Sequence, residues 1–227
     1  HRWARCGRVH SGERHHLAWL MRYHLWLSER AVHLALLGAL DDDTRVTTHA
    51  NQILTGYAAR YRSYPNRDNV LGPTRLFFST YLESIWLIQI SIAASLTGAE
   101  VHDMVAESAA IVRSYDEAWS NRQVWNNAAL IAAGRLLGDE ALVSHGLDGP
   151  HGIRAQLATA VSPDGFWFEG QNYHFFALRG MQLAAELLRY GGVDLYADAR
   201  VGDRFSAMYL APATSLLPDL TIPARSD

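Results

Sequence analysis

The sequence predicts an all-α fold in which antiparallel helical hairpins pack side by side. Apolar residues recur at spacings of three, four and seven along most of the 227 residues, a pattern typical of helices with one buried face. Short turns separate these segments, so consecutive helices should run antiparallel. No segment is a convincing strand, although residues 166–168 could be extended. Periodicity alone leaves open a solenoid, a closed α/α toroid or another soluble helical scaffold.

The first two helices are separated by an acidic turn. Residues 16–40 form the first predicted helix, whose apolar face includes Leu17 and Leu20. Residues 41–44, Asp-Asp-Asp-Thr, interrupt this pattern and offer N-caps for a second helix over about 47–62.

Turn signals divide the rest of the chain into shorter helices. The segment 64–69 and the pair Gly72-Pro73 indicate loops after the second helix. The run Ser162-Pro163-Asp164-Gly165 is a strong turn, because glycine supplies a positive φ. Further helices are predicted over about 74–96, 100–119, 124–137, 152–160, 173–190 and 195–209, followed by a loop over 212–223.

Charge and hydropathy exclude several classes of partner. The net charge is −3 with no basic run, which argues against nucleic-acid binding. The longest apolar run, 85–96, is interrupted by Gln89 and Ser91 and falls short of the roughly 20 residues of a membrane span. The single cysteine, Cys6, excludes an internal disulfide framework. One cysteine with nearby histidines does not make a zinc site, so no metal is expected.

Aromatic residues are plentiful, with seven Trp, ten Tyr and seven Phe. Trp and Tyr have flat apolar faces and a polar handle, which suit carbohydrate binding, although any single aromatic residue is more often part of a core. Residues 22–26 include Arg22, Tyr23, His24 and Trp26 and could line a cleft, but four such close neighbours on one helix cannot all face it.

Three segments resemble a known enzyme family. Residues 162–180 contain the pattern D-G-x-x-x-E-x-x-x-Y-H, with Glu169, Tyr173 and His174 at its key positions. This resembles heparinase II/III-type polysaccharide lyases and oligoalginate lyases, in which the Tyr is catalytic. The segment 121–127, N-R-Q-V-W-N-N, is similar to an upstream segment in which an Asn or His neutralises the substrate carboxylate. Residues 6–13 look like the end of a Cys-containing leader.

The resemblance implies an incomplete (α/α) toroid. Residues 1–13 would be the remnant of a leader, residues 14–210 part of the toroid domain, and residues 211–227 a loop leading toward a C-terminal antiparallel β domain outside this chain. It also implies that the base, a histidine, comes from that β domain, so the chain alone is expected to be inactive or severely impaired.

The implied chemistry is β-elimination on a 1,4-linked uronic acid. The C5 proton is weakly acidic until hydrogen bonds neutralise the adjacent carboxylate and stabilise an enolate-like intermediate. A base then removes this proton while an acid protonates the departing O4. Tyr173 is expected to be the acid, and for one stereochemistry also the base, for which its pKa near 10 must fall.

The residue that neutralises the carboxylate remains open among three asparagines. Asn121, Asn126 and Asn127 each carry an amide that can donate to a carboxylate without a competing pKa. Asn121 and Asn126 are the catalytic candidates, and Asn127 and Trp125 are expected to contact substrate. Alternatively, Asn121 follows Ser120 and could be a helix N-cap.

Other polar residues have two interpretations each. Arg75 could bind a substrate carboxylate or sulfate, or pair with Glu83 two helical turns away. His174 is expected to have a structural or substrate-binding role. Glu169 either supports the site from behind or caps a helix.

The sequence therefore predicts a lyase for acidic oligo- or polysaccharides, either alginate-type or glycosaminoglycans such as heparan sulfate. It is expected to be exolytic and to need no cofactor. The alternatives are a toroid glycoside hydrolase, for which Asp164 and Glu169 are the suggestive carboxylate pair, and a non-catalytic glycan-binding module.

Overall fold

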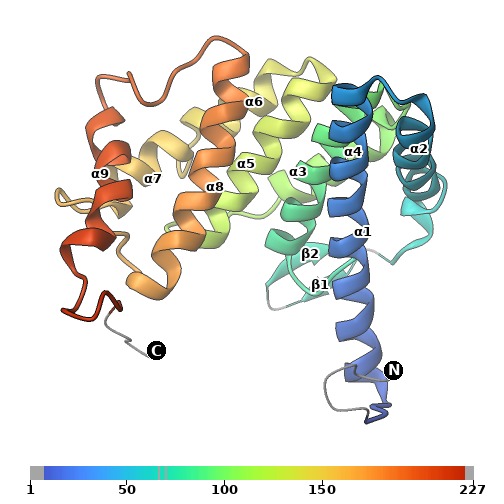
Figure 1. Ribbon diagram of the computed structural model, residues 1–227, viewed down its shortest axis with the longest axis horizontal. Coiled ribbons are helices and arrows are strands. Elements are labelled where there is room, and N and C mark those ends of the chain that lie inside the picture. The colour runs from blue at the N-terminus through green and yellow to red at the C-terminus, as the bar shows by residue number, and fades with distance from the viewer. Residues whose placement is uncertain (1–7, 66, 70, 223–227) are drawn as a thin grey trace.

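The computed structural model describes residues 8–65, 67–69 and 71–222 (Figure 1). Cys6 and most of the predicted leader lie outside these residues. The described helices are α1 (Glu13–Asp41), α2 (Thr44–Ala58), α3 (Thr80–Thr97), α4 (His102–Arg113), α5 (Asn121–Leu137), α6 (Glu140–Asp148), α7 (Ile153–Ala160), α8 (Gln171–Tyr190) and α9 (Gly202–Thr214). A 3-10 turn, Tyr61–Ser63, and two short strands, β1 (Arg67–Asn69) and β2 (Gly72–Thr74), lie between α2 and α3.

The helices form an inner and an outer layer. In the inner layer, α1 packs on α3, α3 on α5, and α5 on α8, while α2, α4 and α6 pack against them as antiparallel partners. Figure 1 shows that α1, α3, α5 and α8 all begin at the same end of the molecule. The loops that precede these four helices therefore gather on one face. The predicted all-α class and the antiparallel hairpins are confirmed.

The two central inner helices, α3 and α5, are buried on nearly every side. Trp86 and Ile90 of α3 and Val124 and Leu130 of α5 have almost no exposed surface. Such all-round burial is expected for helices enclosed by neighbours in both layers. The N-terminal end of α5 is thereby fixed in position, and this is the end that carries the candidate site.

A close approach between α5 and α8 depends on Gly180. A methyl group at this position would lie 2.9 Å from Cγ1 of Val124 and 3.4 Å from the Trp125 ring. We expect Gly180→Ala to lower the free energy of unfolding by about 1 kcal/mol, because overpacking costs ~1–3 kcal/mol and helix propensity returns up to ~1.

Gly56 of α2 is the matched control, since a methyl group there would have a flexible Arg60 nitrogen, 3.8 Å away, as its nearest neighbour. Gly56→Ala should raise the stability by roughly 0.5–1 kcal/mol. Chemical denaturation of both variants measures the difference. A Gly180→Ala protein at least as stable as the wild type would contradict the close packing.

Several predicted elements were wrong in detail. The helix predicted from residue 74 begins at Thr80, because β1 and β2 pair as an antiparallel hairpin with Arg67 opposite Thr74. The prediction that no segment forms a strand was therefore wrong. Helix α6 was missed, although the Asp139 side chain caps it by accepting from two backbone N–H groups. Helix α9 continues through Pro212 to Thr214, where a loop was expected.

Candidate functional site

The first turns of α5 and α8 are joined by the carboxylate of Glu169. Its Oε2 accepts hydrogen bonds from the backbone N–H of Asn121 at 2.7 Å, the Asn121 side-chain Nδ2 at 2.8 Å and the Trp167 indole at 2.8 Å. Glu169 directly precedes Gly170, the N-cap of α8, whose φ of 92° suits glycine. Tyr173 follows in the first turn of α8 and is 37% exposed.

These contacts revise two predictions. Asn121 is the first residue of α5 and not its N-cap, since the Ser120 side chain accepts from the Gln123 N–H and performs that role. Glu169 does not cap its own helix. Its carboxylate instead caps α5, because it accepts the first N–H of that helix, and it also orients the Asn121 amide. These contacts favour a supporting role over direct substrate contact.

All three asparagines are buried, with Asn121 at 6% exposure, Asn126 at 0% and Asn127 at 1%. Asn126 is fully buried, and its Oδ1 accepts from the Ser84 hydroxyl at 2.8 Å, while its Nδ2 has no hydrogen-bond partner among the described residues. Asn127 accepts from Gln123 Nε2 and donates to the His151 carbonyl at 2.7 Å. Because the Asn127 side chain is buried and its amide holds the loop after α6, these contacts argue against substrate binding by Asn127.

A charged cluster that was not predicted surrounds the start of α5. Arg122 forms an ion pair with Glu117, whose side chain is almost fully buried. Burial raises the pKa of Glu117, and the nearby Glu169 carboxylate raises it further, while Arg122 and Asn126 oppose the shift. Burial also raises the pKa of Tyr81. The only signal of this cluster in the sequence was the place of Arg122 inside the N-R-Q-V-W segment.

His174 connects two segments inside the protein. It is buried, its Nδ1 accepts from the Trp167 N–H at 3.2 Å, and its Nε2 lies 2.9 Å from the Met208 carbonyl, to which it donates. The ring thus ties the loop before α8 to α9. Because both ring nitrogens already have partners inside the protein, these contacts favour the structural alternative over substrate binding.

His174 makes stability depend on pH. Burial lowers its pKa from the ordinary value of 6.5, so below that pH the unfolded chain takes up a proton that the folded chain resists. The free energy of unfolding should therefore fall as pH drops from about 7 to about 5. Burial lowers the pKa of His24 as well, and this also makes the free energy of unfolding fall as the pH drops.

Denaturant unfolding across this range, with wild type and His174→Gln, separates the contribution of His174. The variant should be less stable at about pH 7 but have a flatter pH dependence, since it has one fewer group to titrate. Equal slopes for the two proteins would refute the assignment.

Arg75 lies in the segment between β2 and α3, not within a helix as predicted. Its guanidinium binds Glu107 at 2.5 Å and the Tyr64 carbonyl at 2.7 Å. Glu83 instead accepts from Tyr61, Thr74 and the Arg75 backbone N–H. The predicted Arg75–Glu83 side-chain pair was therefore wrong, and a contact between Arg75 and substrate stays a prediction.

A groove of ≈ 680 Å³, which we call the inner groove, lies between helices of the inner layer. Its lining comes from α1, α3, α5 and α8, and Trp125 lies in it beside Phe176, with their ring centroids 5.1 Å apart. Arg22, Tyr23 and Trp26 also line it. His24 does not, because it is buried against the Tyr57 hydroxyl at 3.0 Å. As expected, the α1 side chains do not all face one cleft, as is seen for Arg22, Tyr23, His24 and Trp26.

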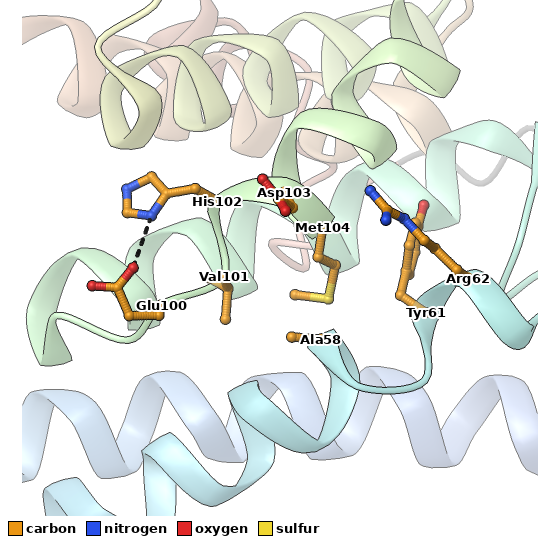
Figure 2. Close-up of a pocket in the computed structure, with 8 residues that line it drawn as sticks. All are labelled: Ala58, Tyr61, Arg62, Glu100, Val101, His102, Asp103 and Met104. Carbon is orange, nitrogen blue, oxygen red and sulfur yellow. Dashed lines mark ion pairs between the residues drawn. The ribbon is translucent and has the colours of Figure 1, made fainter.

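A second pocket, of ≈ 370 Å³, lies between α2 and the start of α4 (Figure 2). Figure 2 shows His102 facing Glu100 at its edge, with the two side chains 3.8 Å apart. None of the predicted site residues lines this pocket, whereas Trp125 lines the inner groove, so the inner groove is the better candidate of these two. No helix in the described part of the chain is long and apolar enough to cross a membrane. Within the same residues, no His, Cys, Asp and Glu side chains gather in a group of three or more that could hold a metal.

Comparison with known proteins identifies the fold and the family. An exo-oligoalginate lyase from Saccharophagus degradans is 31% identical over 157 residues, which cover 60% of this chain and 21% of that protein. The solved structure of a Tyr-to-Phe variant of alginate lyase A1-III, complexed with a tetrasaccharide, superposes with a TM-score of 0.67 at 18% identity. This match covers 94% of this chain and 63% of that one, and it confirms the α/α toroid. This chain spans about a fifth of the length of the exo-oligoalginate lyase. A family model described as alginate lyase matches residues 10–214, so the chain belongs to the alginate lyase family.

Proposed function

We propose that the full-length protein containing this chain is a polysaccharide lyase that cleaves alginate-type uronic-acid chains by β-elimination, acting exolytically on oligosaccharides. Membership of the alginate lyase family and the similarity to an exo-oligoalginate lyase support the substrate class. The observation that carries the proposal is the link from Asn121 through Glu169 to the first turn of α8, which bears Tyr173.

Asn121 is the residue we assign to neutralise the substrate carboxylate. Its Nδ2 carries two hydrogens, and Glu169 accepts one of them, which leaves a second, oriented donor. The positive end of the α5 dipole adds to the attraction for a carboxylate. Asn126 suits this role less well, because it is enclosed between α3 and α5 and has no exposed surface.

Tyr173 is the residue we assign as the acid. A phenol is protonated at neutral pH and can donate its proton to the departing O4 as the C4–O4 bond breaks. The side chain is partly exposed, as a group that must reach substrate has to be. Arg122, which follows Asn121 in the first turn of α5, is held in place by its ion pair with Glu117.

The contacts favour elimination over hydrolysis. A hydrolase needs one carboxylic acid to protonate the leaving group and a second carboxylate opposite it. Glu169 already accepts three hydrogen bonds, and Asp164 accepts one from the Ser162 hydroxyl at 2.5 Å. Neither carboxylate is therefore arranged as a proton donor.

The proposal is tested by incubating the full-length protein with alginate oligomers, heparan sulfate, hyaluronan and chondroitin. Elimination creates a C4–C5 double bond that absorbs in the ultraviolet. We expect absorbance to rise with alginate oligomers. If none of the four substrates gives a rise, the proposed activity is wrong, and a rise with a glycosaminoglycan alone would reassign the substrate.

A further inference from the structure

Helix α1 carries a row of exposed aromatic side chains. Trp19, Tyr23 and Trp26 are spaced four and three residues apart, so they share one face of the helix. The Trp19 and Tyr23 rings stack with their centroids 5.1 Å apart and an interplanar angle of 7°. The Tyr23 and Trp26 rings stack with their centroids 6.1 Å apart and an interplanar angle of 27°. Trp26 is 50% exposed. Three adjacent exposed rings on one helix indicate a binding surface.

This aromatic row lines the inner groove together with two arginines. Arg22 comes from α1 and Arg179 from α8, on the opposite side of the groove. Both are exposed, and neither guanidinium forms an ion pair or hydrogen bond within the part of the chain described. The one carboxylate of the lining, Glu29, is paired with Arg30 at 3.1 Å. The groove therefore has excess positive charge in a chain whose net charge is −3.

We propose that the inner groove is a binding site for the uronate units that extend away from the bond being cleaved. Flat aromatic faces stack on the apolar face of a pyranose ring, and an unpaired guanidinium matches a carboxylate bidentately. A neutral glycan would leave Arg22 and Arg179 without partners, and an apolar ligand would bury their charge. The chemistry of the groove thus selects a carboxylated sugar chain.

Two residues that line the groove lie about one helical turn after the candidate catalytic residues. Phe176 and Arg179 follow Tyr173 by three and six positions on α8, so Arg179 lies about 9 Å farther along the helix axis at ~1.5 Å per residue. Trp125 follows Asn121 by four positions on α5, and both Phe176 and Trp125 line the groove. This inference rests on the proposed function, because it assigns further sugar units of the same substrate to the groove.

Kinetics of the full-length protein on alginate oligomers of increasing length test the inference. Arg179→Gln and Trp26→Ala should each raise KM for long oligomers about tenfold, the loss of one charge-assisted or stacking contact. The KM for the shortest cleaved oligomer and kcat for all lengths should change little. Arg179→Lys, which keeps the charge, should recover part of the affinity.

Matched controls come from the far end of α8. Arg189 and Tyr190 are exposed and do not line the groove, so Arg189→Gln and Tyr190→Ala should leave every KM unchanged. Melting temperatures of all five variants should match the wild type. A lower melting temperature in the groove variants alone would mean that another segment of the protein fills the groove. That result would overturn the inference.

Two results separate this inference from the proposed function. If the protein is an active lyase but the groove variants behave like the controls at every oligomer length, the inference fails alone. Calorimetric titration with an alginate tetrasaccharide tests whether the groove binds the glycan even if the protein is not a lyase. If the wild type binds it without cleaving it, and Arg179→Gln loses that binding, the proposed function fails and the binding site stands.

Discussion

Replacing Tyr173 by Phe in the full-length protein is expected to lower kcat on alginate oligomers by roughly 100- to 10,000-fold, the usual contribution of a general acid. The substitution removes only the phenolic O–H, and the ring, partly exposed in the first turn of α8, keeps its position. KM should therefore change little, because the lost interaction is made with O4 as the bond breaks.

Tyr190→Phe provides the control for this experiment. It removes the same hydroxyl from the same helix at a position that is 95% exposed and distant from the site in sequence. Its kcat should equal that of the wild type. A Tyr173→Phe protein that keeps kcat within a few-fold of the wild type would exclude Tyr173 as the acid and favour a glycan-binding role for the chain.

Replacing Asn121 by Ala should lower kcat by roughly 100- to 1,000-fold, the range found when one preorganised donor to a developing charge is removed. The side chain donates to Glu169 from Nδ2, so the truncation also releases one of the contacts that orient this carboxylate. The backbone N–H of residue 121 still donates to Glu169, and the start of α5 should remain folded.

Asn127→Ala gives the contrasting result. Its amide bridges Gln123 and the His151 carbonyl, so its loss should lower the melting temperature and leave kcat per folded molecule near that of the wild type. If Asn127→Ala loses kcat and Asn121→Ala does not, the assignment of the neutralising amide must be exchanged between these residues.

The sequence predicted the long helices because the spacing of apolar residues and the turn residues that end each helix are local properties. The C-terminal ends of α5 at Leu137 and of α8 at Tyr190 agree with the predicted ends, since glycines follow both. The β1–β2 hairpin could not be predicted in this way, because its three residue pairs are stabilised by hydrogen bonds across a turn. Helix α6, with nine residues, was missed although the Asp139 cap marks its start, whereas the eight-residue α7 was predicted.

Only those residues of the candidate site that lie within the recognised motifs could be predicted from the sequence. The segments around Asn121 and Tyr173 were recognised from the spacing of their residues. The bridge between them depends on Glu169, which contacts a residue 48 positions away, and no local pattern encodes this contact. The same holds for His174 and Asn127, whose polar side chains suggested substrate contacts but bind distant backbone carbonyls in the interior.

The central claim, that this chain belongs to an enzyme that breaks uronic-acid chains by elimination, is tested most directly by mass spectrometry of the products. The full-length protein would be incubated with a purified alginate tetrasaccharide and the products weighed. We predict that the product masses add up to the mass of the substrate, with one product carrying a C4–C5 double bond. Saturated products whose masses add up to the substrate plus one water molecule would contradict the claim and identify a hydrolase.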